Sequence, residues 1–258
     1  MTGLTPMTSV GSADDWDRHW SDYNSAAEKN PAQAFRRRLV LRLLGQSGAP
    51  LKVLDIGSGQ GDFAAALSAR YPSAQVLGLE YSRSGVEIAQ TKAPSASFLQ
   101  RDLLGAVEVP DGYRGWATHA VCSEVLEHVD EPAVLLRNVK PFVAPGCRLV
   151  VTVPGGPMSA FDHHIGHRRH FPPAYLASVL TEAGFQVDRC FGAGFPFFNL
   201  YRLTVIARGR RLSTDLRTGA GGPRSARIAM KVFDGLLHTT LMSGPWGWQT
   251  VGIAHLPG

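Results

Sequence analysis

The sequence predicts an α/β fold: a doubly wound, mostly parallel sheet with helices on both faces. Two observations predict it. From residue 51, short apolar runs alternate with helix-like segments, which is typical of a parallel sheet. These runs are continuously apolar, as expected for strands that helices cover on both faces. The length of 258 residues, with 44% hydrophobic and 18% charged residues, is typical of a large globular domain.

The elements follow in a regular order. Two helices are expected within residues 14–45, separated near Pro31. Five strands are expected at 51–56, 74–80, 97–102, 117–123 and 147–154. Helices are expected at 61–72, 82–92, 131–143 and 172–185, and a loop at 155–171. Later segments are expected as strands (185–191 and 200–207), a helix (233–242) and a loop or edge strand (244–257).

Composition excludes several classes of protein. The three cysteines are scattered, which argues against a disulfide framework and for a reducing compartment. The first 20 residues lack a secretory pattern, and no apolar run approaches the roughly 20 residues of a membrane-spanning helix. We therefore expect a cytoplasmic protein. Residues 208–231 hold seven basic residues and one acid, which leaves open a solvated loop or a patch for an anionic partner.

The first strand-to-helix turn contains three glycines in the stretch 53-VLDIGSGQGDF-63. Glycine permits positive φ and lets a ligand approach the backbone closely. The dinucleotide fingerprint does not fit, because Asp62 occupies its third glycine position. A phosphate-binding P-loop does not fit either, because no Gly-Lys-Ser/Thr follows. We therefore expect a ligand without a pyrophosphate.

Carboxylates follow the next strands. Glu80 ends the second predicted strand, 25 residues after Asp55, where a carboxylate can bind both hydroxyls of a ribose. Asp102 lies two residues beyond the apolar part of the third strand and can accept a hydrogen bond from an adenine amino group. The pattern therefore indicates an adenosine-containing ligand.

The ordered set of motifs resembles a class I S-adenosylmethionine-dependent methyltransferase of the ubiquinone-pathway O-methyltransferase branch. The motifs are D-x-G-x-G-x-G from Asp55, the acid at Glu80, Arg-Asp at Asp102, and 122-CSEVLEHVDEP-132. The resemblance spans roughly residues 35–207. It implies a Rossmann-like sheet of seven strands, one of them antiparallel, and S-adenosylmethionine as cofactor.

The resemblance also implies cofactor contacts and domains. Methionine-side contacts are expected from Asp55, Gly57, Ser58 and Gly59, and Ser123 would lie near the methionine or the ribose. Glu80 would hold the ribose, Asp102 the adenine amino group, Tyr81 and Leu103 the adenine ring, and Tyr23 would belong to a lid. The expected units are a disordered tail (1–13), an N-terminal helical lid (14–48), the methyltransferase domain (49–207) and a C-terminal extension (208–258).

A histidine-rich loop, 161-FDHHIGHRRHF-171, follows the fifth strand on the ligand side of the sheet. If the acceptor is a hydroxyl, a general base assists methyl transfer, and histidine suits neutral pH. His167 and His164 are the candidate bases, and His167 also occupies a recurring position of the resemblance. The alternative is a structural histidine that pins the loop by hydrogen bonds.

Three further side chains, Glu124, Glu127 and His128, leave a metal site open. Their E-x-x-E-H spacing resembles that of small-RNA 2′-O-methyltransferases and related O-methyltransferases, where it is associated with a divalent metal. In other members with this spacing, Glu127 and His128 start or cap a helix. The sequence alone therefore assigns no metal ligand.

The predicted function is in-line methyl transfer from S-adenosylmethionine to a small-molecule or lipid-linked acceptor, with O-methylation favoured. The aromatic stretch 194–202, with Trp246 and Trp248, is expected to line an acceptor pocket, a dimer face or a membrane contact. Two alternatives stay open: an RNA or protein methyltransferase that uses the basic loop, and a cofactor-binding member that transfers no methyl group. No nucleic-acid module is recognised, and the chain is expected as a monomer or homodimer.

Overall fold

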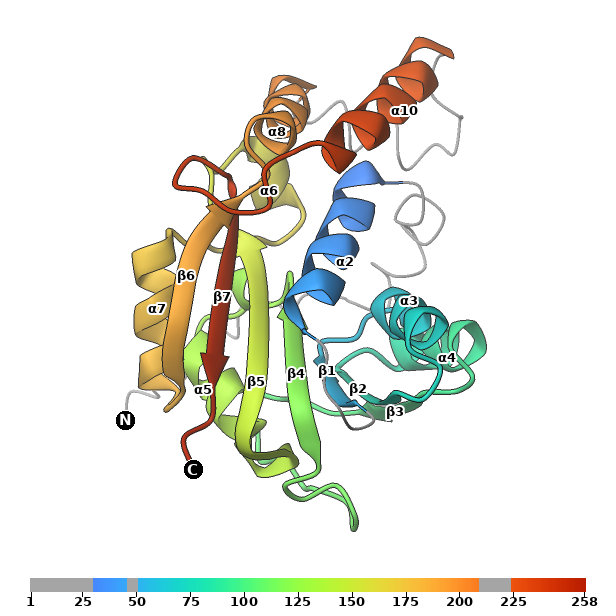
Figure 1. Ribbon diagram of the computed structural model, residues 1–258, viewed down its shortest axis with the longest axis vertical. Helices are drawn as coiled ribbons and strands as arrows, with labels where there is room; N and C mark the ends of the chain where they lie inside the picture. The colour runs from blue at the N-terminus through green and yellow to red at the C-terminus, as the bar shows by residue number, and fades with distance from the viewer. Residues whose placement is uncertain (1–29, 46–50, 209–223) are drawn as a thin grey trace, which may run out of the picture.

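The computed structural model describes residues 30–45, 51–208 and 224–258, and its centre is one seven-stranded sheet (Figure 1). The strand order is β3-β2-β1-β4-β5-β7-β6. The strands are β1 (Lys52–Ile56), β2 (Gln75–Glu80), β3 (Ser97–Gln100), β4 (Ala117–Ser123), β5 (Val143–Pro154), β6 (Gln186–Ala193) and β7 (Gln249–His255). Strands β3, β2, β1, β4 and β5 pair in parallel, and β7 is antiparallel to both β5 and β6.

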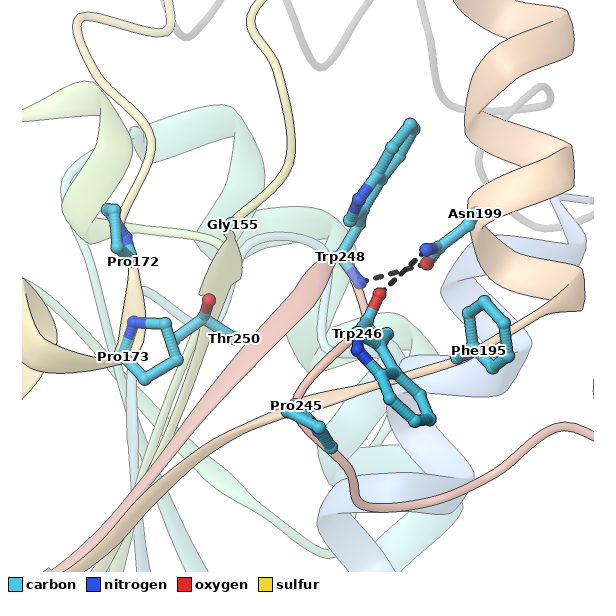
Figure 2. A pocket seen from close by; sticks show the side chains of 10 residues that line it. Gly155, Pro172, Pro173, Phe195, Asn199, Pro245, Trp246, Trp248 and Thr250 are labelled. Carbon is cyan, nitrogen blue, oxygen red and sulfur yellow. Dashed lines mark hydrogen bonds between the residues drawn. The ribbon is translucent and has the colours of Figure 1, made fainter.

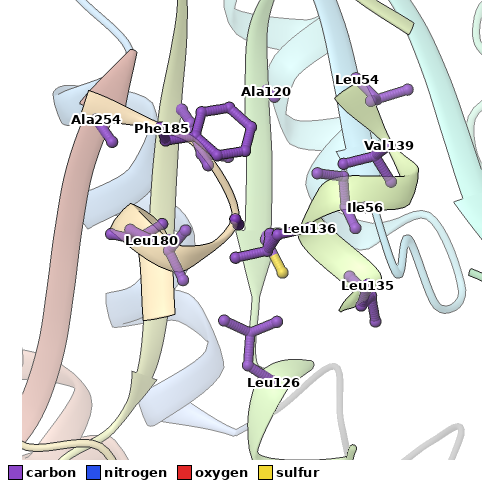
Figure 3. Close-up of a cluster of buried hydrophobic side chains, with 14 of the residues drawn as sticks. Leu54, Ile56, Ala120, Leu126, Leu135, Leu136, Val139, Leu180, Phe185 and Ala254 are labelled. Carbon is purple, nitrogen blue, oxygen red and sulfur yellow. The ribbon is translucent and has the colours of Figure 1, made fainter. Parts of the chain in front are cut away.

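Helices cover both faces of the sheet. One face carries α2 (Pro31–Leu43), α3 (Asp62–Arg70) and α4 (Arg83–Lys92), and the other carries α5 (Pro132–Asn138) and α7 (Pro173–Glu182). Successive strand residues point to opposite faces. Val53 therefore packs with α2, α3 and α4, while Leu54 and Ile56 pack with α5 and α7 (Figure 3). This two-sided burial explains the continuous apolar runs in the sequence.

A third apolar cluster lies beyond the carboxyl ends of the parallel strands. There α6 (Ala160–His164), α8 (Phe197–Arg208) and α10 (Arg224–His238) gather near the first turns of α2 (Figure 1). Phe35 of α2 and Phe198 of α8 bring their ring centroids to 5.2 Å. Helix α2 starts at Pro31, and the Asn30 side chain caps it by accepting from the Ala32 N–H. These additions therefore build one wall around the ligand edge of the sheet.

Most of the predicted elements are confirmed, including the five strands from residue 51 and the helices between them. Short 3₁₀ turns occur at Leu126–His128 and Lys140–Phe142, the second inside the range expected for one helix. The expected loop at 155–171 contains α6. The first predicted N-terminal helix, the tail 1–13 and Tyr23 lie outside the described residues.

Two predictions about the end of the sheet are wrong. Residues 200–207 form part of helix α8 and not a strand. Residues 249–255 form β7, which lies between β5 and β6 and is not an edge strand. The predicted domain boundary after residue 207 would therefore place β7, an interior strand of the sheet, in the C-terminal extension. Among the helices described, none is long and apolar enough to span a bilayer.

Candidate active site

The glycine loop between β1 and α3 has the backbone shape that the sequence predicts. Gly57, Gly59 and Gly61 have φ of 69°, 53° and 77°, all in the left-handed region. A Cβ at Gly57 would lie 2.4 Å from Val125 Cγ2, so a side chain has no room there. The N–H of Gly57 donates to the Leu79 carbonyl at 2.8 Å, which ties the loop to β2. The loop is therefore closely packed and held by its own backbone.

Two buried carboxylates stand at the tips of β1 and β2. Glu80 is 6% exposed and accepts the Gly59 N–H at Oε2 (2.8 Å) and the Ser82 N–H at Oε1 (2.9 Å). Asp55 is 3% exposed, and its Oδ2 has no hydrogen-bond partner among the described residues. Burial, with the nearby Glu80, raises the pKa of Asp55 to about 7. An unpaired buried carboxylate of this kind is stabilised by a cationic ligand group.

S-adenosylmethionine fits these features. Its ammonium group can satisfy the unbonded Oδ2 of Asp55, beside a loop whose positive-φ glycines leave the backbone bare of side chains. The side chain of Ser58 points toward β2, because its Oγ lies 2.7 Å from where a Cβ on Gly78 would be. Ser58 can therefore contribute its backbone, as can Gly57 and Gly59.

The other predicted cofactor residues lie along the same edge. Tyr81 and Asp102 are exposed and Leu103 is buried. Asp102 Oδ1 accepts the Leu104 N–H at 2.9 Å, which shapes the turn after β3. Ser123, at the tip of β4, shares a 2.8 Å hydrogen bond with Thr152 of β5. Exposed ring and carboxylate groups next to Glu80 suit an adenosine lying across the strand tips.

The segment after β4 joins the glycine loop to a second cluster of polar side chains. Val125 contacts Gly57, and Glu127 and His128 follow within the next three residues. Glu127 is fully buried, and neither of its carboxylate oxygens has a hydrogen-bond partner among the described residues. Burial, reinforced by Glu124, raises the pKa of Glu127 well above its usual value. This buried carboxyl group is the strongest indication that the second cluster is a ligand site.

His167 faces Glu127 from the loop after β5. Its Nε2 lies 4.0 Å from Glu127 Oε1, and its ring meets that of His128 edge-on with centroids 4.8 Å apart. Burial and the neighbouring His128 lower the pKa of His167 to about 2. The imidazole is therefore neutral at physiological pH.

A hydrogen-bond chain fixes which nitrogen of His167 carries the proton. His170 Nδ1 lies 2.5 Å from the Gly156 carbonyl, which can only accept, so this nitrogen is the donor. The neutral His170 then accepts at Nε2, 3.3 Å from His167 Nδ1. His167 accordingly donates from Nδ1 and presents the lone pair of Nε2 toward Glu127.

Sequence reasoning missed the residues that anchor this loop. Asp162 is fully buried and accepts both contacts of Arg202 Nη2, at 2.8 and 2.9 Å. It also forms a capping box with Ser159 at the start of α6. Although burial opposes it, Arg202 and Ser159 hold the pKa of Asp162 below its usual value. The pair joins α6 to α8, and only the S-x-x-D spacing at residue 159 signals part of it.

Of the three possible metal ligands that the sequence suggests, the structure keeps Glu127 and His128 together and separates Glu124 from them. Glu127, His128 and His167 place one ligand atom each within 4.8 Å of one another. Glu124 instead pairs with Arg36 at 3.1 Å and accepts from Gln249 Nε2 at 2.8 Å. Its φ of 58° is unusual for a residue other than glycine and turns the chain toward these partners.

A second potential metal set shares His167 but is otherwise occupied. Asp162, His167 and His170 also place ligand atoms within 4.8 Å of one another. Asp162 is paired with Arg202, and His170 donates to Gly156. His164, the other predicted base, ends α6 with an exposed side chain.

Relatives of known function carry methyltransferase names. The chain is 29% identical over 171 residues to a trans-aconitate 2-methyltransferase of Methylobacterium nodulans, which covers 66% of this chain and 61% of that protein. It is 35% identical over 198 residues to a demethylmenaquinone methyltransferase of Thermus thermophilus, which covers 71% of this chain and 84% of that protein. These two relatives carry names for different acceptors.

A solved structure confirms the fold. The [4+2]-cyclase SpnF matches with a TM-score of 0.56 at 18% identity, covering 88% of this chain and 82% of that chain. Residues 27–189, more than half of the chain, match the family described as a methyltransferase domain. Together with the glycine loop and the carboxylates at the strand tips, this match shows that the chain belongs to the class I S-adenosylmethionine-dependent methyltransferases.

Proposed function

We propose that this enzyme methylates a hydroxyl group of a small-molecule acceptor at the histidine cluster beside the glycine loop. The observation that carries the proposal is the contact between Val125 and Gly57, which places Glu127 and His128 next to the cofactor loop. An acceptor held there would lie close to the reacting methyl group. Positioning two reactants in this way can lower the activation free energy by about 7–11 kcal/mol.

The chain's own residues have separable roles in this proposal. When bound, S-adenosylmethionine supplies an electrophilic methyl group on a positively charged sulfur. Asp55 binds the ammonium group, the loop from Gly57 to Gly59 holds the methionine part, and Glu80 holds both the loop and the ribose. Asp102, Tyr81 and Leu103 flank the adenine, and Ser123 borders the methionine side.

His167 is the proposed base for the acceptor hydroxyl. Its Nε2 carries the lone pair, because His170 and the Gly156 carbonyl fix the proton on Nδ1. Proton removal at Nε2 would increase the nucleophilicity of the acceptor oxygen as it attacks in line with the departing sulfur. The depressed pKa of His167 weakens it as a base acting alone.

A divalent cation is the second candidate for this cluster. Glu127, wholly buried with both oxygens unbonded among the described residues, and the imidazoles of His128 and His167 form a carboxylate–imidazole set that suits a transition metal. Such a cation would act as a Lewis acid on the acceptor hydroxyl. In that case His167 is a ligand through Nε2 and not a base, and His170 orients it.

One experiment tests the proposal directly. The purified protein is incubated with S-adenosylmethionine labelled in its methyl group and an extract of the host, and products that gain the label are identified by mass spectrometry. Label on an oxygen of a small molecule supports the proposal, and label on a nitrogen or carbon would contradict it. Label on RNA or protein would favour the alternative in which the basic segment 208–231 binds the acceptor. Binding to nucleic acid would then weaken steeply with salt.

A further inference from the structure

A cavity opens on the same edge of the sheet as the cofactor loop. It has a volume of about 640 Å³, and Figure 2 shows its walls. Gly155, just after the end of β5, and Thr250, near the start of β7, lie on its inner side. Because β7 is antiparallel, its first residues meet the carboxyl ends of β5 and β6. The cavity is therefore at the edge where α/β sheets bind ligands.

The walls of the cavity are apolar and rigid. Three prolines and three aromatic rings make up most of them: Pro172, Pro173, Pro245, Phe195, Trp246 and Trp248. None of the described residues that line the cavity carries a charged side chain. Its amide, Asn199, is already used, because it donates to the Trp246 carbonyl at 2.7 Å and accepts the Trp248 N–H at 2.9 Å (Figure 2). The cavity thus offers little to a charged ligand.

The loop that carries the tryptophans is fixed before any ligand binds. Gly244 donates to the Gly192 carbonyl at 2.8 Å, and a Cβ on Gly247 would lie 2.2 Å from the Ala193 carbonyl oxygen. Close backbone packing of this kind holds residues 244–248 against the end of β6. A preformed wall lowers the entropy cost of binding.

Two aromatic rings at the mouth of the cavity remain uncovered. Trp246 is 65% exposed and Phe195 is 36% exposed, and their ring centroids lie 5.6 Å apart. Large exposed rings beside an apolar cavity are typical of a ligand site.

The cavity shares a chain segment with the histidine cluster. Gly156, which follows the cavity residue Gly155, accepts the hydrogen bond of His170. Two residues after His170 the chain enters Pro172 and Pro173, which line the cavity. A molecule that reaches from the histidine cluster past these residues would place its far end in the cavity.

We propose that this cavity binds an uncharged apolar group of the methyl acceptor, a ring or a hydrocarbon chain, and so selects the acceptor class. The inference rests on the proposed function, because it assigns the cavity to the substrate whose hydroxyl reacts at the histidine cluster. Trp246 and Phe195 cover the apolar group, and the prolines form a rigid floor.

Binding of simple probes tests the inference. Calorimetry compares 2-naphthol, which is uncharged at pH 7, with naphthalene-2-sulfonate, which has the same ring and a negative charge. 1-Octanol serves as the chain-like probe. We expect at least one neutral probe to bind about tenfold more tightly than the sulfonate, because no charged side chain among the described lining residues would compensate the buried charge.

Variants of Trp246 assign the binding to the cavity. Trp246→Ala should weaken the neutral probe at least about fivefold, and Trp246→Phe should restore it to within about twofold, since a ring recovers most of the buried area. Val232→Ala is the matched control, because Val232 is an exposed apolar residue of α10 outside the cavity. S-adenosylmethionine affinity is measured in each variant and should not change.

Several outcomes would overturn the inference. These are equal affinity for the sulfonate, probe binding that Trp246→Ala does not affect, or a loss in that variant of phosphatidylcholine-vesicle binding or self-association alone. Loss of vesicle binding alone would assign Trp246 to a membrane contact, and loss of self-association alone would assign it to a dimer face. A protein that binds neutral probes in the cavity but no S-adenosylmethionine would contradict the proposed function while leaving the cavity's apolar specificity intact.

Discussion

His167 and His170 are joined through their ring nitrogens, with Nδ1 of the first 3.3 Å from Nε2 of the second. Because the Gly156 carbonyl fixes the proton of His170 on Nδ1, the pair has one consistent direction of donation. The reactive nitrogen of His167 is thus selected by a residue that need not contact the acceptor. His170 is a positioning residue in the proposed mechanism.

Replacing His170 should therefore lower turnover without affecting cofactor binding. His170→Ala removes the acceptor for His167 Nδ1–H, and we expect a loss of about 10–100-fold in turnover, as is typical when the partner of a working histidine is removed. The control is His163→Ala, which replaces an exposed histidine of the nearby helix α6. Steady-state kinetics and calorimetry with S-adenosylmethionine check this, and a KM effect with unchanged turnover would reject the positioning role.

Cofactor affinity should rise with pH in a way that depends on Asp55. The pKa of Asp55 is about 7 in the ligand-free protein, and only its ionised form attracts the ammonium group. Between pH 6 and pH 8 the ionised fraction increases from about one tenth to about nine tenths, so affinity should increase about tenfold. Calorimetry at both pH values checks this, and the Asp55→Asn variant should bind weakly with no such increase. A flat profile in the unmodified protein would contradict the assignment.

The same carboxyl group should reduce the stability of the ligand-free protein at high pH. The folded-state pKa of Asp55 lies above its ordinary value of 3.8, so the folded state binds more protons than the unfolded state between these values. Its contribution to the free energy of unfolding therefore falls as pH rises from about 4 to about 7. Asp55→Asn should raise the melting temperature at pH 8 and change it little at pH 4. Equal effects at both pH values would be inconsistent with a buried, titrating carboxyl group.

Gly57 allows the steric and conformational costs of a side chain to be separated. Gly57→Ala adds a methyl group 2.4 Å from Val125 Cγ2 at a φ of 69°. Gly112→Ala, at a φ of 85° with no atom within 4 Å, carries the conformational cost alone. We expect Gly112→Ala to lower the free energy of unfolding by about 1 kcal/mol and Gly57→Ala by about 2–4 kcal/mol. Chemical denaturation measures both, and adding Val125→Ala to Gly57→Ala should recover part of the difference.

A divalent cation should stabilise the protein through Glu127. At about 100 times its dissociation constant, a ligand of the folded state adds about 2.7 kcal/mol to the free energy of unfolding. We expect Mn²⁺ or Zn²⁺ to raise the melting temperature, EDTA to reverse the increase, and Glu127→Gln to abolish it. Glu108→Gln, at an exposed carboxylate, is the control. Full activity after exhaustive EDTA treatment would exclude a catalytic metal.

The parts of the fold that follow local patterns could be predicted from the sequence. Strand β1 and the glycine loop are adjacent in the chain, so one short stretch contains both the apolar run and the turn. The stretch 200-LYRLTVIA-207 predicts a strand because it is rich in residues that favour strands, but it forms part of helix α8. Its buried residues Tyr201 and Val205 are four apart, which is a helical spacing. Packing against α2 and α10 therefore favours the helix over the strand.

Contacts between distant segments could not be predicted. Asp162 and Arg202 lie 40 residues apart, and nothing local marks them as a pair. The three residues that could hold a metal, Glu127, His128 and His167, also could not be predicted as a set. The spacing of Glu124, Glu127 and His128 draws attention to one segment, but only the fold directs Glu124 away to Arg36 and Gln249 and brings His167 in.

The position of β7 has a consequence for how the chain folds during synthesis. Among the described strands, β6 pairs with β7 alone, and β7 spans residues 249–255, so β6 lacks its partner until that segment leaves the ribosome. Gln249, which holds Glu124, arrives with it. Until residues 249–255 are synthesised, the nascent chain exposes the edge of β5 and lacks part of the candidate site, which makes it dependent on protection from edge-to-edge aggregation.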